Sequence, residues 1–173
     1  MDIQIRKEEP ADFPAVYKLN HEAFKSEGEA KLVEALRKSS AFIPDLSLVA
    51  ELNGIPVGHI LFTKLEILGP DEKIFKSLAL APMAIAPDYQ NHGIGSELIK
   101  EGLKIASAIG HESIIVLGHE SYYPKFGFTP ASRFNIKPPF DVPDSAFMAL
   151  ELNQESLKGV NGIVRYPKEF NEV

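Results

Sequence analysis

Two glycines stand two positions apart where an apolar run gives way to a helical pattern. The run from Leu78 to Ile85 leads into Gln90-Asn91-His92-Gly93-Ile94-Gly95, after which apolar residues recur at helical spacing as far as Ile109. Glycines let the backbone bend tightly and approach a ligand without a Cβ in the way. A helix N-terminus adds unbonded amides and the positive end of its dipole. The segment therefore predicts an anion site, and a pyrophosphate is its natural occupant.

Two familiar phosphate motifs do not account for this segment, and a glycine pair alone also fits a simple turn. The Rossmann fingerprint needs a third glycine three residues further on, where Leu98 stands. A P-loop needs the triplet Gly-Lys-Ser/Thr, which the chain lacks. The anion site therefore calls for another motif.

The segment resembles the acetyl-CoA loop of the GNAT N-acetyltransferase superfamily, Gln/Arg-x-x-Gly-x-Gly/Ala. The stretch Met83-Ala84-Ile85-Ala86-Pro87 stands in place of that family's strand and its turn. A second signature, Tyr-x-x-φ-Gly-Phe with φ apolar, matches Tyr123 to Phe128. The resemblance runs from about Ile3 to Ala131. It looks closest to a bacterial subfamily of uncharacterised acetyltransferases, since Leu117-Gly118-His119 followed by Tyr122-Tyr123 is typical of that subgroup.

The resemblance implies how acetyl-CoA would be held. Main-chain groups of the strand would pair with the pantetheine arm as if it were another strand, and the loop would hold the pyrophosphate. The implied cofactor residues are Met83, Ala84 and Ile85 on the strand, and Gln90, Asn91, His92, Gly93, Ile94, Gly95 and Ser96 on the loop. A backbone amide on the strand would also polarise the thioester carbonyl.

The resemblance also implies catalytic roles. Tyr123 matches the position whose phenol donates a proton to the departing thiolate, although a tyrosine also commonly serves in packing. The apolar strand offers no proton acceptor, so His119 or Glu120 is the candidate base, directly or through a water, although both also fit solvated loop residues. The resemblance also allows for a missing base, whose place a chain of waters would take. The asparagine that relatives usually carry before the tyrosine motif is missing here. His92 is interpreted as structural.

Hydrophobic periodicity predicts the elements that position these residues. The expected helices cover residues 11–24, 29–38, 94–109 and 121–126; the expected strands are 3–5, 47–52, 55–68, 78–85, 113–117 and 147–152. This order indicates a mixed α/β sheet with a parallel crossover in its second half. The resemblance implies a single GNAT-type domain over 1–173 with its core in 3–152, about 6–7 strands splayed at the cofactor site and about 4 helices. Pro82 predicts a bulge in the strand.

Composition narrows the function classes. The chain has 173 residues, a net charge of −6 and no cysteine, which argues against a nucleic-acid binder and excludes thiolate metal sites. His21, His59 and His111 are too dispersed to suggest a metal centre. The N-terminus lacks a signal-peptide pattern and no stretch is long enough to span a membrane, so a cytoplasmic, soluble protein is expected. Dimers are common in the superfamily, which is compatible with a homodimer.

The predicted activity is transfer of an acetyl group from acetyl-CoA to a primary amine of a small molecule, peptide or protein, by direct attack in a ternary complex. The acidic residues Glu22, Glu27, Glu29 and Glu34 on the first two helices either favour a cationic acceptor or form a solvated face. The alternatives are a non-catalytic acyl-CoA-binding sensor or partner domain, a different acyl chain on the same scaffold, and a nucleotide-binding protein of another fold.

Overall fold

The computed structural model describes residues 1–171, which form three α-helices, nine strands and several short 3-10 turns. The chain divides into two compact units. The first comprises Met1–Thr63, Ala81–Ile105 and the segment from Lys168, and the second comprises Lys64–Leu80 and Ala106–Pro167. Two strands, β3 (Ile55–Leu68) and β4 (Ile74–Ile85), and the helix α3 (Ile94–Ala108) each continue from one unit into the other.

Antiparallel pairing organises the first unit. β1 (Ile3–Lys7) pairs with β2 (Phe42–Leu52), which pairs with β3. The predicted hairpin at Asn53-Gly54 is present, and both residues have positive φ, at 52° and 80°, as a two-residue Asn-Gly turn requires. β2 begins at residue 42, five residues before the predicted start at 47. The prediction missed these first residues because they carry no clear alternation of apolar and polar side chains.

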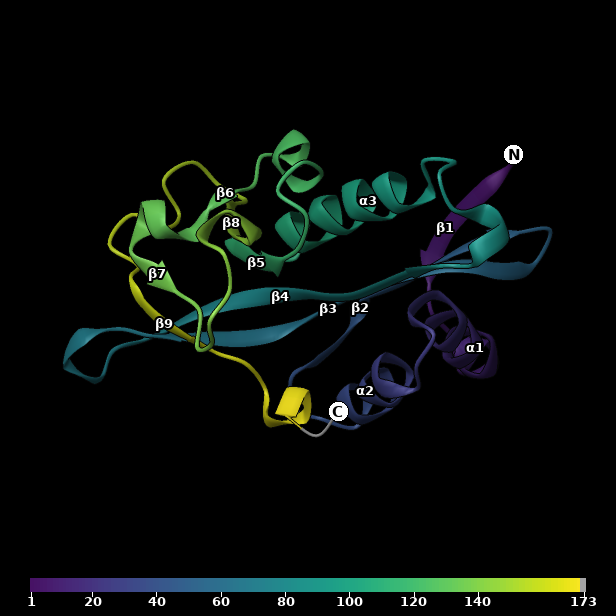
Figure 1. The fold of residues 1–173 in the computed structure, drawn as a ribbon, viewed down its shortest axis with the longest axis horizontal. Coiled ribbons are helices and arrows are strands. Elements are labelled where there is room, and N and C mark those ends of the chain that lie inside the picture. Colours follow the sequence, from purple (N-terminus) through teal and green to yellow (C-terminus); the bar gives the residue numbers. More distant parts are fainter. Residues whose placement is uncertain (172–173) are drawn as a thin grey trace. The chain divides into compact units, whose positions relative to one another are not determined.

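Helices cover both faces of these strands (Figure 1). On one face, α1 (Phe13–Phe24) and α2 (Gly28–Arg37) enclose a core with the strands. That core consists of Val16, Leu32, Val33, Leu36, Val49 and Leu61. The neighbouring Phe62 points to the opposite face, because successive side chains of a strand alternate. There a Cβ on Gly102 of α3 would collide with its ring, so the glycine lets α3 lie close against β3.

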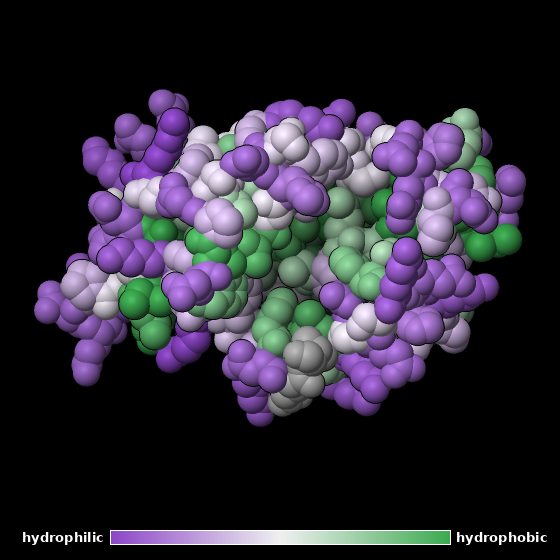
Figure 2. Space-filling view, viewed as in Figure 1, coloured by the Kyte–Doolittle hydropathy of each residue, from purple (hydrophilic) through white to green (hydrophobic). Residues whose placement is uncertain are grey.

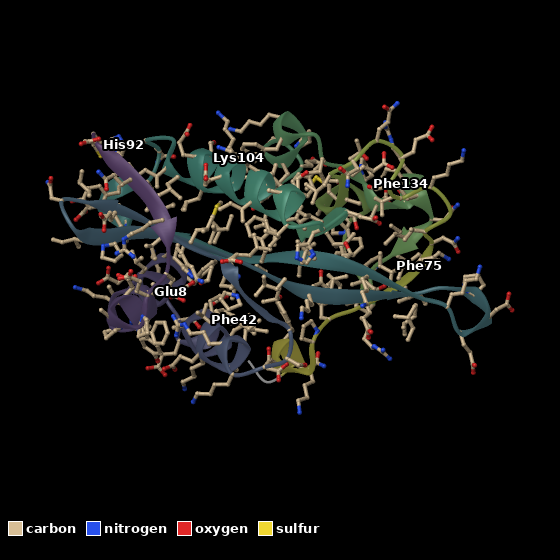
Figure 3. All side chains as sticks on the ribbon, turned by 180° about the vertical axis from the view of Figure 1, so that it is seen from behind. Glu8, Phe42, Phe75, His92, Lys104 and Phe134 are labelled. Carbon is tan, nitrogen blue, oxygen red and sulfur yellow. The ribbon has the colours of Figure 1, made fainter. Side chains whose placement is uncertain are left out.

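A buried polar network joins α2 to the strands of the first unit. The carboxylate of Glu8, labelled in Figure 3, accepts hydrogen bonds from Arg37 at 3.1 and 2.6 Å and from the Ser47 hydroxyl at 2.9 Å. The Ser47 oxygen also lies 3.0 Å from Nε2 of His59, which is completely buried. The network satisfies the Glu8 carboxylate and the Ser47 hydroxyl, which would otherwise be costly to bury.

Parallel and antiparallel pairing meet in the second unit. The first half of β4 pairs in parallel with β5 (Ser113–Leu117), which confirms the predicted crossover, and β5 pairs antiparallel with β8 (Phe147–Glu151). Three shorter strands, β6 (Thr129–Pro130), β7 (Ile136–Lys137) and β9 (Gly162–Arg165), complete this unit. They lie outside the predicted set because segments of two to four residues carry too little periodicity to recognise.

Two local expectations differ in detail from the structure. The predicted fourth helix is a 3-10 turn, Tyr123–Phe126, because Pro124 stands within it and Gly127 ends it at a φ of 102°. β4 begins at Ile74, before the predicted start at Leu78, and it continues through Pro82, where the Ala81–Pro82 peptide bond is cis.

Hydrophilic side chains cover much of the face shown in Figure 2. Among the described helices, none has both the length and the apolarity to cross a membrane.

Candidate active site

Successive side chains at the end of β4 point to opposite faces of the sheet and differ in burial. Ala84 is buried, whereas the flanking Met83 and Ile85 are half-buried. The Ala86 amide donates to the Val57 carbonyl of β3 at 2.9 Å. Because successive residues of an extended strand direct their main-chain groups to opposite edges, those of Met83 and Ile85 point away from β3, while those of Ala84 point toward it.

The chain then turns sharply through residues 86–93. A 3-10 turn, Pro87–Tyr89, is followed by Asn91 and Gly93, whose φ values are 65° and 82°. Asparagine and glycine are the residues that adopt this region most easily. The Gln90 side-chain amide donates to the Ile85 carbonyl at 3.1 Å, so it bonds back to the end of β4.

The N-terminus of α3 follows directly. The first hydrogen bond of the helix runs from the Glu97 amide to the Gly93 carbonyl at 3.1 Å. The amides of Gly93, Ile94 and Gly95 therefore have no carbonyl one turn earlier in the helix to bind. A helix of 15 residues adds the positive end of its dipole at this point. Asn91, His92 and Gly93, which precede this end of the helix, are exposed residues, and the His92 side chain lies at the surface (Figure 3).

Apolar contacts fix the helix N-terminus against the end of β4. A Cβ added to Gly58 on β3 would lie 3.0 Å from Ile85 and 3.2 Å from both Ile94 and Leu98. Those three side chains therefore converge over Gly58, and a larger residue there would require them to shift. Gly58 is not among the predicted site residues, because an isolated glycine in a strand pattern does not reveal which side chains approach it.

Tyr123 lies in the second unit, at the start of the 3-10 turn after β5. Its ring packs edge-on against Tyr122 and Phe128, with centroids 5.1 and 5.7 Å away, and lies against Gly118, where a Cβ would collide with it. Burial raises the pKa of the Tyr123 phenol to about 12. No hydrogen bond from its hydroxyl is found in the described part of the chain. The phenol is thus held in place by packing, and it stays protonated at neutral pH.

The two candidate bases, His119 and Glu120, have exposed side chains in the turn that precedes Tyr123. The His119 carbonyl accepts the amides of Tyr122 and Tyr123 at 3.1 and 3.4 Å, so the backbone of this turn is ordered by the tyrosine segment. Sequence proximity thus brings His119, Glu120 and Tyr123 into one turn of the second unit. The loop residues 90–96 and Met83, Ala84 and Ile85 gather in the first unit.

The acidic surface of α1 and α2 is partly neutralised. Lys18 lies 3.8 Å from Glu22, and Lys31 lies 3.1 Å from Glu27, each one helical turn away. Hydrogen bonding to Lys31 lowers the pKa of Glu27. Surface pairs of this kind add little stability but cancel the local charge. This arrangement weakens the expectation of an acidic surface selective for a cationic acceptor.

Within residues 1–171, no group of three or more His, Asp or Glu side chains could hold a metal ion. His59 and His111 lie in separate environments. His59 belongs to the buried Glu8 network, and His111 follows α3 in the second unit, where burial and the charge of Lys64 lower its pKa.

Comparison with known proteins agrees with this arrangement. The model of the acetyltransferase (GNAT) family matches residues 13–128. The uncharacterized N-acetyltransferase YhbS of Escherichia coli K12 is 32% identical over 168 residues, which cover 96% of this chain and 98% of YhbS. The uncharacterized N-acetyltransferase YjhQ of the same strain is 36% identical over 135 residues, covering 78% of this chain and 74% of YjhQ.

Solved structures show the same fold. The crystal structure of E. coli YhbS in complex with CoA has a TM-score of 0.89 at 32% identity, covering 98% of this chain and 92% of that one. A GNAT family acetyltransferase from Brucella melitensis in complex with acetyl-CoA has a TM-score of 0.79 at 32% identity, covering 98% of both chains. The chain therefore belongs to the GNAT family of acetyltransferases. The predicted family, the mixed α/β fold and the N-acetyltransferase class are confirmed.

Proposed function

We propose that this protein binds acetyl-CoA and transfers its acetyl group to a primary amine. The observation that carries the proposal is the turn from β4 into α3, where the exposed residues Asn91 and Gly93, at positive φ, lead into the N-terminus of a 15-residue helix. Relatives with 32% identity over nearly the whole chain bind CoA or acetyl-CoA in their crystal structures. Both observations support the same cosubstrate.

The residues of the first unit fit this cosubstrate. The amides from Asn91 to Ser96 would hold the pyrophosphate, because they combine hydrogen-bond donors with the helix dipole. The main-chain groups of Met83 and Ile85, at the edge of β4 opposite β3, would bind the pantetheine arm, and Ala84 would support the strand from its buried side. Acetyl-CoA supplies an activated thioester, and an amide at this edge would polarise its carbonyl.

In the second unit, Tyr123 is the proposed proton donor to the leaving thiolate. Burial raises the pKa of its phenol to about 12, so the phenol carries its proton at neutral pH, and the ring packs against Gly118. His119 and Glu120 remain the proposed bases that deprotonate the attacking ammonium, directly or through water.

Because acetyl-CoA is the cosubstrate, we place the reaction in the cytoplasm. That the protein forms a homodimer remains a prediction.

Thermal unfolding with and without acetyl-CoA tests the cosubstrate, and release of free thiol across a panel of amines tests the transfer. A ligand at 100 times its dissociation constant adds about 2.7 kcal/mol of stability. Stabilisation with thiol release for some amine supports the enzyme, and stabilisation without thiol release for any amine favours an acyl-CoA sensor. If acetyl-CoA gives no stabilisation, the proposal is wrong.

A matched pair of variants locates the cosubstrate on the loop. Gly93→Asn and Gly93→Asp have the same size, and both residues tolerate the φ of 82° better than other side chains. Only the aspartate adds a negative charge beside the proposed pyrophosphate. We expect Gly93→Asp to bind CoA at least about tenfold more weakly than Gly93→Asn, as charge repulsion in a partly desolvated site predicts. Equal affinities would place the pyrophosphate elsewhere.

A further inference from the structure

Gln90 is the first residue of the loop motif, and its side chain forms a hydrogen bond within the protein itself. Its amide nitrogen donates to the Ile85 carbonyl at 3.1 Å, across five residues of the chain. Ile85 is the last residue of β4, and its main-chain groups point to the edge opposite β3. The side chain therefore links the loop to the strand end that is proposed to bind pantetheine.

Two contacts thus hold the end of β4 and the N-terminus of α3 close together. On the apolar side, Ile85 and Ile94 converge over Gly58 of β3. On the polar side, the Gln90 amide closes the loop onto Ile85. Between these contacts lie two residues at positive φ, Asn91 and Gly93. Few backbone hydrogen bonds of their own hold these two residues in that conformation. The Gln90 bond is therefore a polar contact that limits how far the loop can move from β4.

We propose that Gln90 is a positioning residue, which sets the spacing between the pantetheine-binding strand and the pyrophosphate-binding loop, and is not itself a phosphate ligand. This inference rests on the proposed function of the same site. A ligand that spans both parts benefits from their fixed spacing, because the cost of ordering the loop has already been met before binding. A ligand that engages only the loop does not depend on this spacing.

The chemistry of the side chain fits the role. The bond requires a donor, because the Ile85 carbonyl can only accept. Gln and Arg, the two residues that the family motif allows at this position, both carry side-chain N–H donors of suitable length. Methionine has nearly the same length as glutamine and no donor. The substitutions Gln90→Met and Gln90→Arg therefore separate the hydrogen bond from side-chain size.

The test measures the affinity of each variant for two ligands by calorimetry. CoA spans strand and loop, and adenosine 3′-phosphate 5′-diphosphate carries the diphosphate without pantetheine. We expect Gln90→Met to weaken CoA binding about three- to tenfold, the range for loss of one hydrogen bond, and to change binding of the diphosphate fragment less than about twofold. Gln90→Arg should remain within about twofold of the wild type for both ligands.

Gln154→Met, an exposed glutamine in the turn after β8, is the matched control and should bind both ligands as the wild type does. Thermal unfolding without ligand checks that every variant is folded. If Gln90→Met weakens CoA and the fragment equally, Gln90 contacts the phosphates and the inference is wrong. It is equally wrong if CoA binding does not change. If the wild type itself binds no CoA, the proposed function fails, and the inference fails with it.

Discussion

The buried imidazole of His59 makes the stability of this protein depend on pH. Its Nε2 lies 3.0 Å from the Ser47 oxygen, and the Ser47 hydroxyl donates to Glu8, whose carboxylate also receives Arg37. Since the serine proton is used for Glu8, His59 must donate its own Nε2 proton to Ser47. Within the described residues its Nδ1 has no hydrogen-bond partner, so a second ring proton there would be buried without an acceptor.

Burial accordingly lowers the pKa of His59 from 6.5 to about 4, despite the opposing attraction of Glu8. The unfolded chain binds a proton near pH 6.5 and the folded chain only near pH 4. The contribution of this group to stability is therefore complete above pH 6.5 and is lost as the pH falls toward 4. Between about pH 7.5 and about pH 5, the loss amounts to about 2 kcal/mol.

Urea denaturation of the wild type and His59→Gln, at several pH values across this range, measures the effect. Glutamine can still donate to Ser47 but does not titrate, so the pH-dependent difference between the two proteins isolates His59. His21→Gln, which replaces an exposed histidine on α1, is the control and should follow the wild type. Parallel stability curves for the wild type and His59→Gln would refute the assignment of a buried neutral imidazole.

Two further substitutions test the catalytic turn and the packing of α3. Tyr123→Phe keeps the ring against Gly118 and removes the proton donor. We therefore expect kcat to fall by about 100-fold or more, with CoA affinity unchanged. Thiol-release kinetics that show a loss of kcat below about threefold would contradict this role. Gly102→Ala places a methyl against the Phe62 ring and should lower the free energy of unfolding by about 1–3 kcal/mol. Urea denaturation should show that Phe62→Leu restores part of this loss, and no restoration would mean that the clash lies elsewhere.

Local patterns were enough to predict the turn from β4 into α3. The glycines of the loop, the helix that follows and the second motif around Tyr123 lie within short stretches, and the conformations they require are properties of those residues themselves. The Asn53-Gly54 hairpin is of the same kind, since its positive φ values follow from residue type. The parallel crossover could also be predicted, because a strand, a helix and a strand in succession have few ways to pack.

Other features depended on side chains that meet only after folding. The length of β2 and the strands β6, β7 and β9 arise from partners distant in the sequence. Gly58 and Gly118 look ordinary in the sequence, and their importance comes from the side chains that pack against them.

The sequence by itself therefore determined the family of the protein and the turn from β4 into α3, because the backbone conformations of the motif residues follow from residue type. Tertiary structure decided that His59 is buried beside Glu8 and that Gln90 bonds to β4. Burial, hydrogen-bond partners and pKa depend on which groups the folded chain brings into contact. Residue type alone does not specify those neighbours.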